Sequence, residues 1–235
     1  VLAKSSGNKP RDLAEIFSAR LANTPGVETV EVAGPGFVNL RLANAFWQQQ
    51  ISEILNAGLD YGDSNSDGGQ SINIEYVSAN PTGPMHVGHA RGAVIGDVLA
   101  SLLTKVGYVV TREYYINDAG VQVDVLARSA HLRYREALGE EIGAIPDGLY
   151  PGDYLVGVGE ALADRDGGKW RSCPEEDWLP AVRDFTIDAM MGLIREDLAA
   201  LGIVHELFRS ERSLHDEDRI AEVVSVLEER DLVYW

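Results

Sequence analysis

This sequence has only one cysteine, no long hydrophobic run and no excess of basic residues. The single Cys173 excludes an internal disulfide framework and a cysteine-cluster zinc site, and it favours a reducing compartment. No stretch approaches the roughly 18 consecutive apolar residues of a transmembrane helix. The opening VLAKSSGNKPRD lacks the apolar segment of a signal peptide. We therefore expect a cytoplasmic protein with no membrane partner.

Acidic residues outnumber basic ones, and the formal net charge is −17 over 235 residues. Most of the excess lies in the second half, since residues 1–115 carry −3 and residues 116–235 carry −14. A nucleic-acid partner needs basic surface to contact its phosphates, so the total charge argues against one unless a local basic groove exists. A solubilising acidic surface accounts equally for the excess.

The first 58 residues have the pattern of a small α+β domain. Helical periodicity flanks two alternating segments that are separated by the turn signal Gly34-Pro35-Gly36, which predicts a helix, a β-hairpin and a second helix. The predicted helices are 10–23 and 45–58, and the predicted strands are 27–34 and 36–43. Residues 59–71 are rich in Gly, Asp, Asn and Ser and form the predicted linker.

Residues 72–235 follow a different pattern, in which β-rich runs alternate with amphipathic helices. This order is typical of βαβ units and predicts an α/β domain with a parallel sheet. A Gly-, Pro- and Asp-rich stretch around 140–175 indicates an insertion with one short helix. The predicted strands are 72–78 and 108–116, and the predicted helices are 86–107, 119–138, 177–201 and 215–232.

The most informative stretch is PTGPMHVGHARGA, residues 81–93, which places two histidines three residues apart at the start of a helix. A helix that follows a parallel strand points its unpaired N–H groups and positive dipole end at the ligand edge of the sheet, which suits a phosphate. His86 and His89 lie on one helical face, and Gly88 opens the first turn to a ligand. Imidazole donors there can stabilise charge that develops on an α-phosphate during displacement by a carboxylate.

Each of these residues also has a simpler interpretation. A histidine at a helix start is commonly a surface or capping residue, and Gly88 can be a packing glycine. Zinc binding by His86 and His89 is a weaker functional alternative, because no further ligand lies on that turn. The strand, the Pro/Gly loop and the helix together favour the nucleotide-binding interpretation.

Residues 72–120, INIEYVSANPTGPMHVGHARGAVIGDVLASLLTKVGYVVTREYYINDAG, closely resemble the catalytic-domain entry of arginyl-tRNA synthetases, which are class I enzymes with an HIGH-type signature. YPGDYLVGVGEALADRDGGKW (150–170) and GPGFVNLRL (34–42) fit the same family. The resemblance implies the first half of a Rossmann-like nucleotide-binding domain over 72–235, preceded by a tRNA-contacting domain over 1–58. It further implies ATP-dependent activation of L-arginine and transfer to tRNA(Arg), with Mg²⁺ bound to ATP and a monomeric enzyme.

The resemblance also assigns residue roles. His86 and His89 carry the catalytic assignment, and Pro84 and Gly88 join them in holding ATP. Contacts to arginine are implied for Glu75, Ser78, Asn80, His89, Asn117 and Asp118, and a contact to tRNA for Asn39. Three of these have equally simple alternatives: Glu75 as an exposed strand carboxylate, Asp118 as a helix N-cap, and Asn39 as an outward strand residue.

Two family features are missing from these residues, namely a KMSKS-like lysine loop and a helical anticodon-binding domain. With no starting methionine and an end at Trp235, both termini look like cuts through a larger protein, and we expect the fragment alone to be inactive. Two other functions stay open: another nucleotidyltransferase of the HxGH type, and a non-catalytic synthetase-like binding module.

Overall fold

The computed structural model describes residues 2–65 and 68–233, which divide into two compact units. The first unit extends to Asp63 and the second begins at Ser64, so the division falls inside the predicted linker. Residues 66 and 67 of that linker lie outside the described residues. Each unit is described separately below.

The first unit is a β-hairpin with a helix packed against it, as the sequence pattern predicts. Antiparallel pairing joins Val30 to Leu40 and Ala33 to Phe37. Gly36 permits the contact with the helix, because a Cβ atom there would lie 2.7 Å from the backbone of Pro10. The elements are α1 (Leu2–Ser6), α2 (Pro10–Leu21), β1 (Val27–Ala33), β2 (Phe37–Leu42), α3 (Asn44–Ala57) and the short η1 (Gly58–Asp60).

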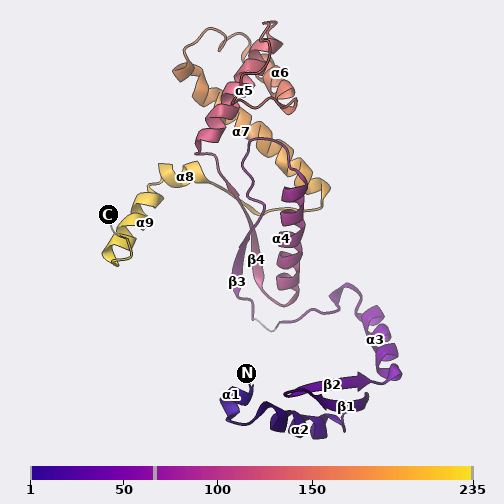
Figure 1. The fold of residues 1–235 in the computed structure, drawn as a ribbon. Coiled ribbons are helices and arrows are strands. Elements are labelled where there is room, and N and C mark those ends of the chain that lie inside the picture. Colours follow the sequence, from indigo (N-terminus) through magenta and orange to yellow (C-terminus); the bar gives the residue numbers. More distant parts are fainter. Residues whose placement is uncertain (1, 66–67, 234–235) are drawn as a thin grey trace. The chain divides into compact units, whose positions relative to one another are not determined.

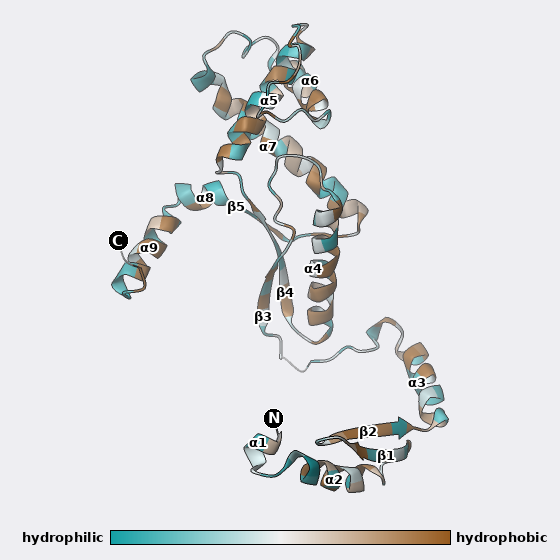
Figure 2. Ribbon diagram, in the orientation of Figure 1, coloured by the Kyte–Doolittle hydropathy of each residue, from teal (hydrophilic) through white to brown (hydrophobic). Residues whose placement is uncertain are grey.

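The second unit contains a three-stranded parallel sheet in the order β3-β4-β5, which confirms the predicted α/β class (Figure 1). α4 is rich in hydrophobic residues, whereas α8 is largely hydrophilic (Figure 2). The strands are β3 (Ser71–Glu75), β4 (Val109–Ile116) and β5 (Leu207–Ser210). The helices are α4 (Val87–Lys105), α5 (Val121–Ala137), α6 (Tyr154–Asp166), α7 (Glu175–Ala200), α8 (Glu211–Asp216) and α9 (Arg219–Glu229).

Two hydrophobic clusters fill the second unit. The sheet cluster joins Tyr76 and Tyr114 to the second half of α7, and Gly96 on α4 makes room for it, since a Cβ atom there would lie 2.3 Å from the Tyr76 ring. The other cluster, here called the helical core, packs α5, α6 and α7 together at the carboxyl ends of the strands (Figure 1). Within it His131 stacks on Trp178 with ring centroids 3.8 Å apart.

Several features differ from the sequence prediction. β3 ends at Glu75 and not at residue 78, because the backbone turns into the left-handed region at Val77 and Ser78. The helix predicted over 215–232 is broken into α8 and α9 at Asp218, which has a φ of 55°. The short elements α1 and β5 were not predicted, since five and four residues are too few for a periodic signal.

The close packing of α6 on α5 gives a stability test. A Cβ atom on Gly159 would lie 2.4 Å from the carbonyl carbon of Arg133, which is backbone and cannot move aside. We expect Gly159→Ala to lower the free energy of unfolding by about 1–3 kcal/mol, the range for overpacking. The measurement is chemical denaturation followed by circular dichroism.

Gly157→Ala is the matched control on the same helix, because a Cβ atom there meets nothing within 4 Å. The control should leave stability unchanged or raise it by up to about 1 kcal/mol through higher helix propensity. Equal effects of the two substitutions would contradict the close approach of the two helices.

Candidate functional site

The candidate site begins where the chain leaves β3. Val77 and Ser78 adopt φ values of 70° and 41°, which are unusual for residues with a Cβ atom. The Ser78 hydroxyl donates to Oε1 of Glu75 at 2.6 Å and accepts from the backbone N–H of Tyr115 at 3.1 Å. These two hydrogen bonds tie the bend to the last residue of β3 and to β4.

The 79–85 loop follows this bend and leads to the first turn of α4. The buried Tyr114 hydroxyl donates to the Ala79 carbonyl at 2.8 Å, and this burial raises the pKa of Tyr114 to about 12. Asn80 donates to Oε1 of Gln122 at 2.8 Å. A pocket of about 290 Å³ lies between the loop and the helix, lined by Asn80, Thr82, Gly83, Pro84, His86 and His89.

His86 and His89 form a reciprocal cap at the start of α4. Nδ1 of His86 accepts from the backbone N–H of Gly88 at 3.1 Å, and Nδ1 of His89 accepts from the N–H of His86 at 3.4 Å. The two rings stack with centroids 3.7 Å apart. The same pair thus caps the helix and lines the pocket.

This geometry fixes which ring nitrogen carries the proton. An Nδ1 atom that accepts a hydrogen bond has no proton, so each neutral ring carries its proton on Nε2, which is the remaining donor. Burial, and secondly the charge that His86 can carry, lower the pKa of His89 from its ordinary value of 6.5. At neutral pH His89 is therefore a neutral donor beside the pocket.

Gly88 has a clear packing role. A Cβ atom there would lie 3.0 Å from Cε1 of His86, so the glycine makes room for that ring to fold over the first turn. Val87, between the two, is 87% exposed. The cap turns the two rings to one side of the helix start and leaves Val87 outside the packed face.

The structure places the other predicted residues around the carboxyl ends of β3 and β4. Glu75 is exposed and is held by Ser78. Asn117 is half-buried at the end of β4. Asp118 is buried and accepts from the Ser210 hydroxyl at 2.6 Å and from the Arg212 N–H at 2.9 Å. The N-cap alternative for Asp118 is wrong, because α5 is preceded by Gly120 with no side-chain cap.

Zinc binding receives no support from the described residues. Over residues 2–65 and 68–233 no group of three or more His, Cys, Asp or Glu side chains is arranged to hold a metal ion. Within the same ranges no helix has the length and hydrophobicity needed to span a membrane.

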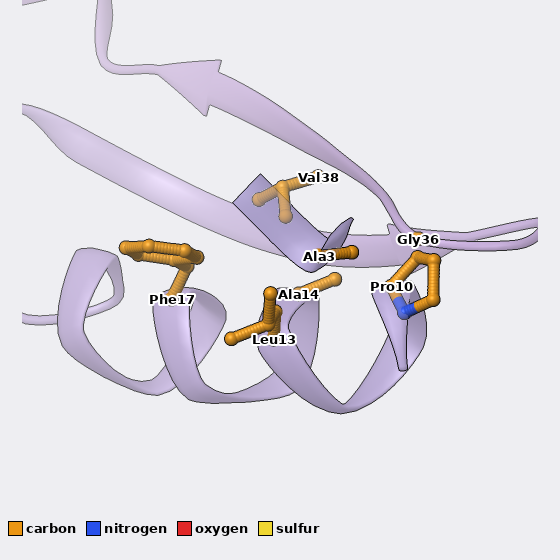
Figure 3. Close-up of a pocket in the computed structure, with 7 residues that line it drawn as sticks. All are labelled: Ala3, Pro10, Leu13, Ala14, Phe17, Gly36 and Val38. Carbon is orange, nitrogen blue, oxygen red and sulfur yellow. The ribbon is translucent and has the colours of Figure 1, made fainter. Parts of the chain in front are cut away.

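The first unit carries two shallow sites of its own. Asn39 is exposed on β2 opposite Glu31, in a concavity of about 360 Å³ that Thr29 and Arg41 also line. A second pocket of about 340 Å³ separates α2 from the hairpin (Figure 3). Its lining is apolar, from Ala3, Pro10, Leu13, Ala14, Phe17, Gly36 and Val38, so no side chain there can transfer a proton or bind a phosphate.

Sequence reasoning missed the residues that hold the 79–85 loop from outside. Gln122 contacts it from α5, Tyr154 from α6 and Asp197 from α7, where the carboxylate accepts from the Met85 N–H at 3.1 Å. Asp197 is separated from its partner by 112 residues, so no local pattern signals it. Only the YPGDY segment around Tyr154 was singled out, and it had no assigned role.

Comparisons with known proteins agree across both units. Residues 1–42 match the family model described as the arginyl tRNA synthetase N terminal domain, and residues 50–145 match that of class I (R) tRNA synthetases, catalytic domain. The arginine–tRNA ligase of Agrobacterium fabrum is 62% identical over 216 residues, which is 92% of this chain and 37% of the relative. That of Rhodopseudomonas palustris is 58% identical over 236 residues, which is 100% of this chain and 40% of the relative.

Solved structures give the same result. An arginyl-tRNA synthetase structure from Campylobacter jejuni has a TM-score of 0.71 at 34% identity, covering 83% of this chain and 42% of that one. The Thermus thermophilus enzyme, at 21% identity and a TM-score of 0.57, supports the fold alone. The chain spans about two fifths of the length of the curated relatives it matches. Both family models are matched in order, the N-terminal domain first and the catalytic domain after it. The chain therefore belongs to the arginyl-tRNA synthetase family.

Proposed function

We propose that this chain is the N-terminal part of an arginine–tRNA ligase, which activates L-arginine with ATP and transfers it to tRNA(Arg). The observation that carries the proposal is the presentation of two Nε2 donors at the mouth of α4, directly behind the 79–85 loop and the carboxyl end of a parallel strand. Identity of 58–62% to arginine–tRNA ligases over nearly the whole chain supports it. We place the enzyme in the cytoplasm as a monomer.

In this proposal the arginine carboxylate attacks the α-phosphorus of ATP. A new O–P bond forms, the bond to the bridging oxygen breaks, and pyrophosphate leaves with its electron pair. Negative charge grows on the α-phosphate oxygens, where the Nε2–H groups of His86 and His89 donate to it. No general base is needed because the nucleophile is already ionised, so the residues act by positioning and by charge stabilisation.

The remaining contacts are those that the resemblance to the family implies. Pro84 lines the pocket proposed for ATP, Gly88 joins it in holding ATP from the first turn of α4, and Mg²⁺ accompanies the triphosphate. Ser78, Asn80 and His89 face the arginine α-amino and carboxylate groups. Glu75 supplies negative charge for a cationic group of arginine. Asn117 lines the pocket wall, and Asp118 supports that wall through Ser210 and Arg212. Asn39, in the first unit, contacts tRNA.

The test uses a chimera that joins residues 1–235 to the remaining part of the Agrobacterium fabrum relative. Arginine-dependent exchange of pyrophosphate into ATP, measured with and without tRNA, is the expected result. Exchange that does not depend on arginine would identify another nucleotidyltransferase. Absence of both exchange and ATP binding would identify a non-catalytic module and overturn the proposal.

Single substitutions of the two histidines test the catalytic geometry. In the chimera His86→Ala and His89→Ala should each lower kcat for adenylate formation by about 10²–10³, the usual cost of removing one transition-state donor. The measurement is single-turnover adenylate formation. Val87→Ala is the control and should have little effect, because that side chain is exposed. Unchanged rates in both histidine variants would make the rings purely structural.

A second prediction concerns recognition of arginine by Glu75. Glu75→Gln keeps the contact with the Ser78 hydroxyl but removes the charge, so kcat/KM for arginine should fall by about 10- to 100-fold, the cost of one charged hydrogen bond. KM for ATP should stay unchanged in the same exchange assay. An equal loss for both substrates would show that the substitution disturbs the bend and not the recognition of arginine.

A further inference from the structure

The YPGDY segment, residues 150–154, reaches across to the 79–85 loop. The Tyr154 hydroxyl donates to the Thr82 carbonyl at 2.7 Å. The Tyr154 ring also packs closely against Gly83, since a Cβ atom on that glycine would lie 3.2 Å from the ring. One aromatic side chain of α6 therefore holds the loop by a hydrogen bond and by close packing.

A second residue holds the same loop from α7. Oδ2 of Asp197 accepts from the backbone N–H of Met85 at 3.1 Å. Met85 immediately precedes His86, the N-cap of α4. Because a carboxylate is a stronger acceptor than a neutral oxygen, this contact fixes the entry of the chain into the helix.

Contacts of the YPGDY segment set the direction of the Tyr154 side chain. The Tyr150 N–H donates to the Ser129 hydroxyl at 2.9 Å, and Arg133 donates to the Pro151 carbonyl at 3.3 Å, so α5 holds the start of the segment. Gly152 then permits the ring to fold back, because a Cβ atom there would lie 2.1 Å from the Tyr154 ring. The direction of the ring follows from these contacts.

We propose that Tyr154 of α6 and Asp197 of α7 are positioning residues that set the 79–85 loop, so that His86 and His89 present their Nε2 donors together. The two contacts lie on either side of Gly83-Pro84, at Thr82 and Met85. Prolines fix local φ angles but not the direction of a loop. The consequence for catalysis rests on the proposed function, whereas the positional role can be tested without it.

The decisive comparison is Tyr154→Phe against Tyr134→Phe in this chain. Both remove one hydroxyl from the helical core, but that of Tyr134 donates to the Gly167 carbonyl at 2.6 Å, away from the loop. The readout is the pH titration of histidine ring protons by NMR, assigned by single histidine substitutions. Thermal unfolding of both variants verifies that each remains folded.

Tyr154→Phe should shift the ring signals of His86 and His89 and weaken the contact between their rings. The pKa of His89 should rise toward 6.5, because its burial and the nearby His86 charge both lower that pKa and both depend on the stacked arrangement. Tyr134→Phe should instead affect His131, whose ring lies 5.6 Å from the Tyr134 ring. Unchanged His86 and His89 signals in a folded Tyr154→Phe chain would overturn the proposal, as would the same response to both variants.

Further variants test whether the positions of the Tyr154 ring and the Asp197 side chain matter, and not merely the loss of a chemical group. Gly152→Ala should reproduce the effect of Tyr154→Phe by displacing the ring, while Gly157→Ala within α6 should not. Asp197→Ala should shift His86 and His89, and Asp197→Asn should largely restore them, since an amide oxygen still accepts from Met85. Failure of the Asn variant to restore the signals would contradict the role given to Asp197.

The chimera then links position to catalysis. Tyr154→Phe should lower kcat for adenylate formation by about three- to tenfold, the usual weight of one neutral hydrogen bond, with KM for arginine unchanged. Tyr134→Phe should leave both constants unchanged. If the chimera lacks arginine-dependent exchange while the NMR shifts appear as expected, the proposed function fails and the positional role stands; an unaltered kcat in an active Tyr154→Phe chimera would remove its catalytic consequence.

Discussion

The unpaired backbone amides at the start of α4 determine how the candidate site is built. The first turn of a helix leaves N–H groups without partners inside the helix, and here two of them bond to histidine side chains. Each ring therefore uses Nδ1 for the backbone and keeps Nε2–H for a ligand. The cap requires an unprotonated Nδ1. The lowered pKa of His89 favours its neutral form and therefore favours the cap. A single arrangement thus satisfies the helix and supplies donors.

The histidines reach that position because the chain leaves the sheet abruptly. Two consecutive residues in the left-handed region, Val77 and Ser78, cost about 1–3 kcal/mol each. The Ser78 hydroxyl offsets part of this cost by bonding to Glu75 and Tyr115, and the neighbouring Tyr76 ring is buried against Gly96. Strain of this kind persists where the surroundings fix it, and such places are commonly functional.

Much of the architecture was predictable because its signals are local. The hairpin has Gly34-Pro35-Gly36 between two alternating runs, and the strand–helix–strand order around α4 predicts a parallel sheet. The histidine pair was equally visible. The bend at Val77 could not be predicted, because the local pattern of INIEYVS is that of one continuous strand. The contact between Ser78 and Tyr115 on β4 is not visible in that pattern. Asp118 was misread as a possible N-cap for the same reason, since its partners Ser210 and Arg212 are more than 90 residues away.

The contacts from α6 and α7 explain why the insertion-like segment around Tyr154 packs so specifically. The 79–85 loop receives Tyr114 from the sheet at its beginning, then Tyr154 and Asp197 from the helices at its middle and end. A loop held only by the sheet would still be free to swing about its attachment, whereas contacts from packed helices on another side remove that freedom. Because side chains at a site must be held within fractions of an ångström, the helices α5, α6 and α7 act as part of the site without contributing a reacting group.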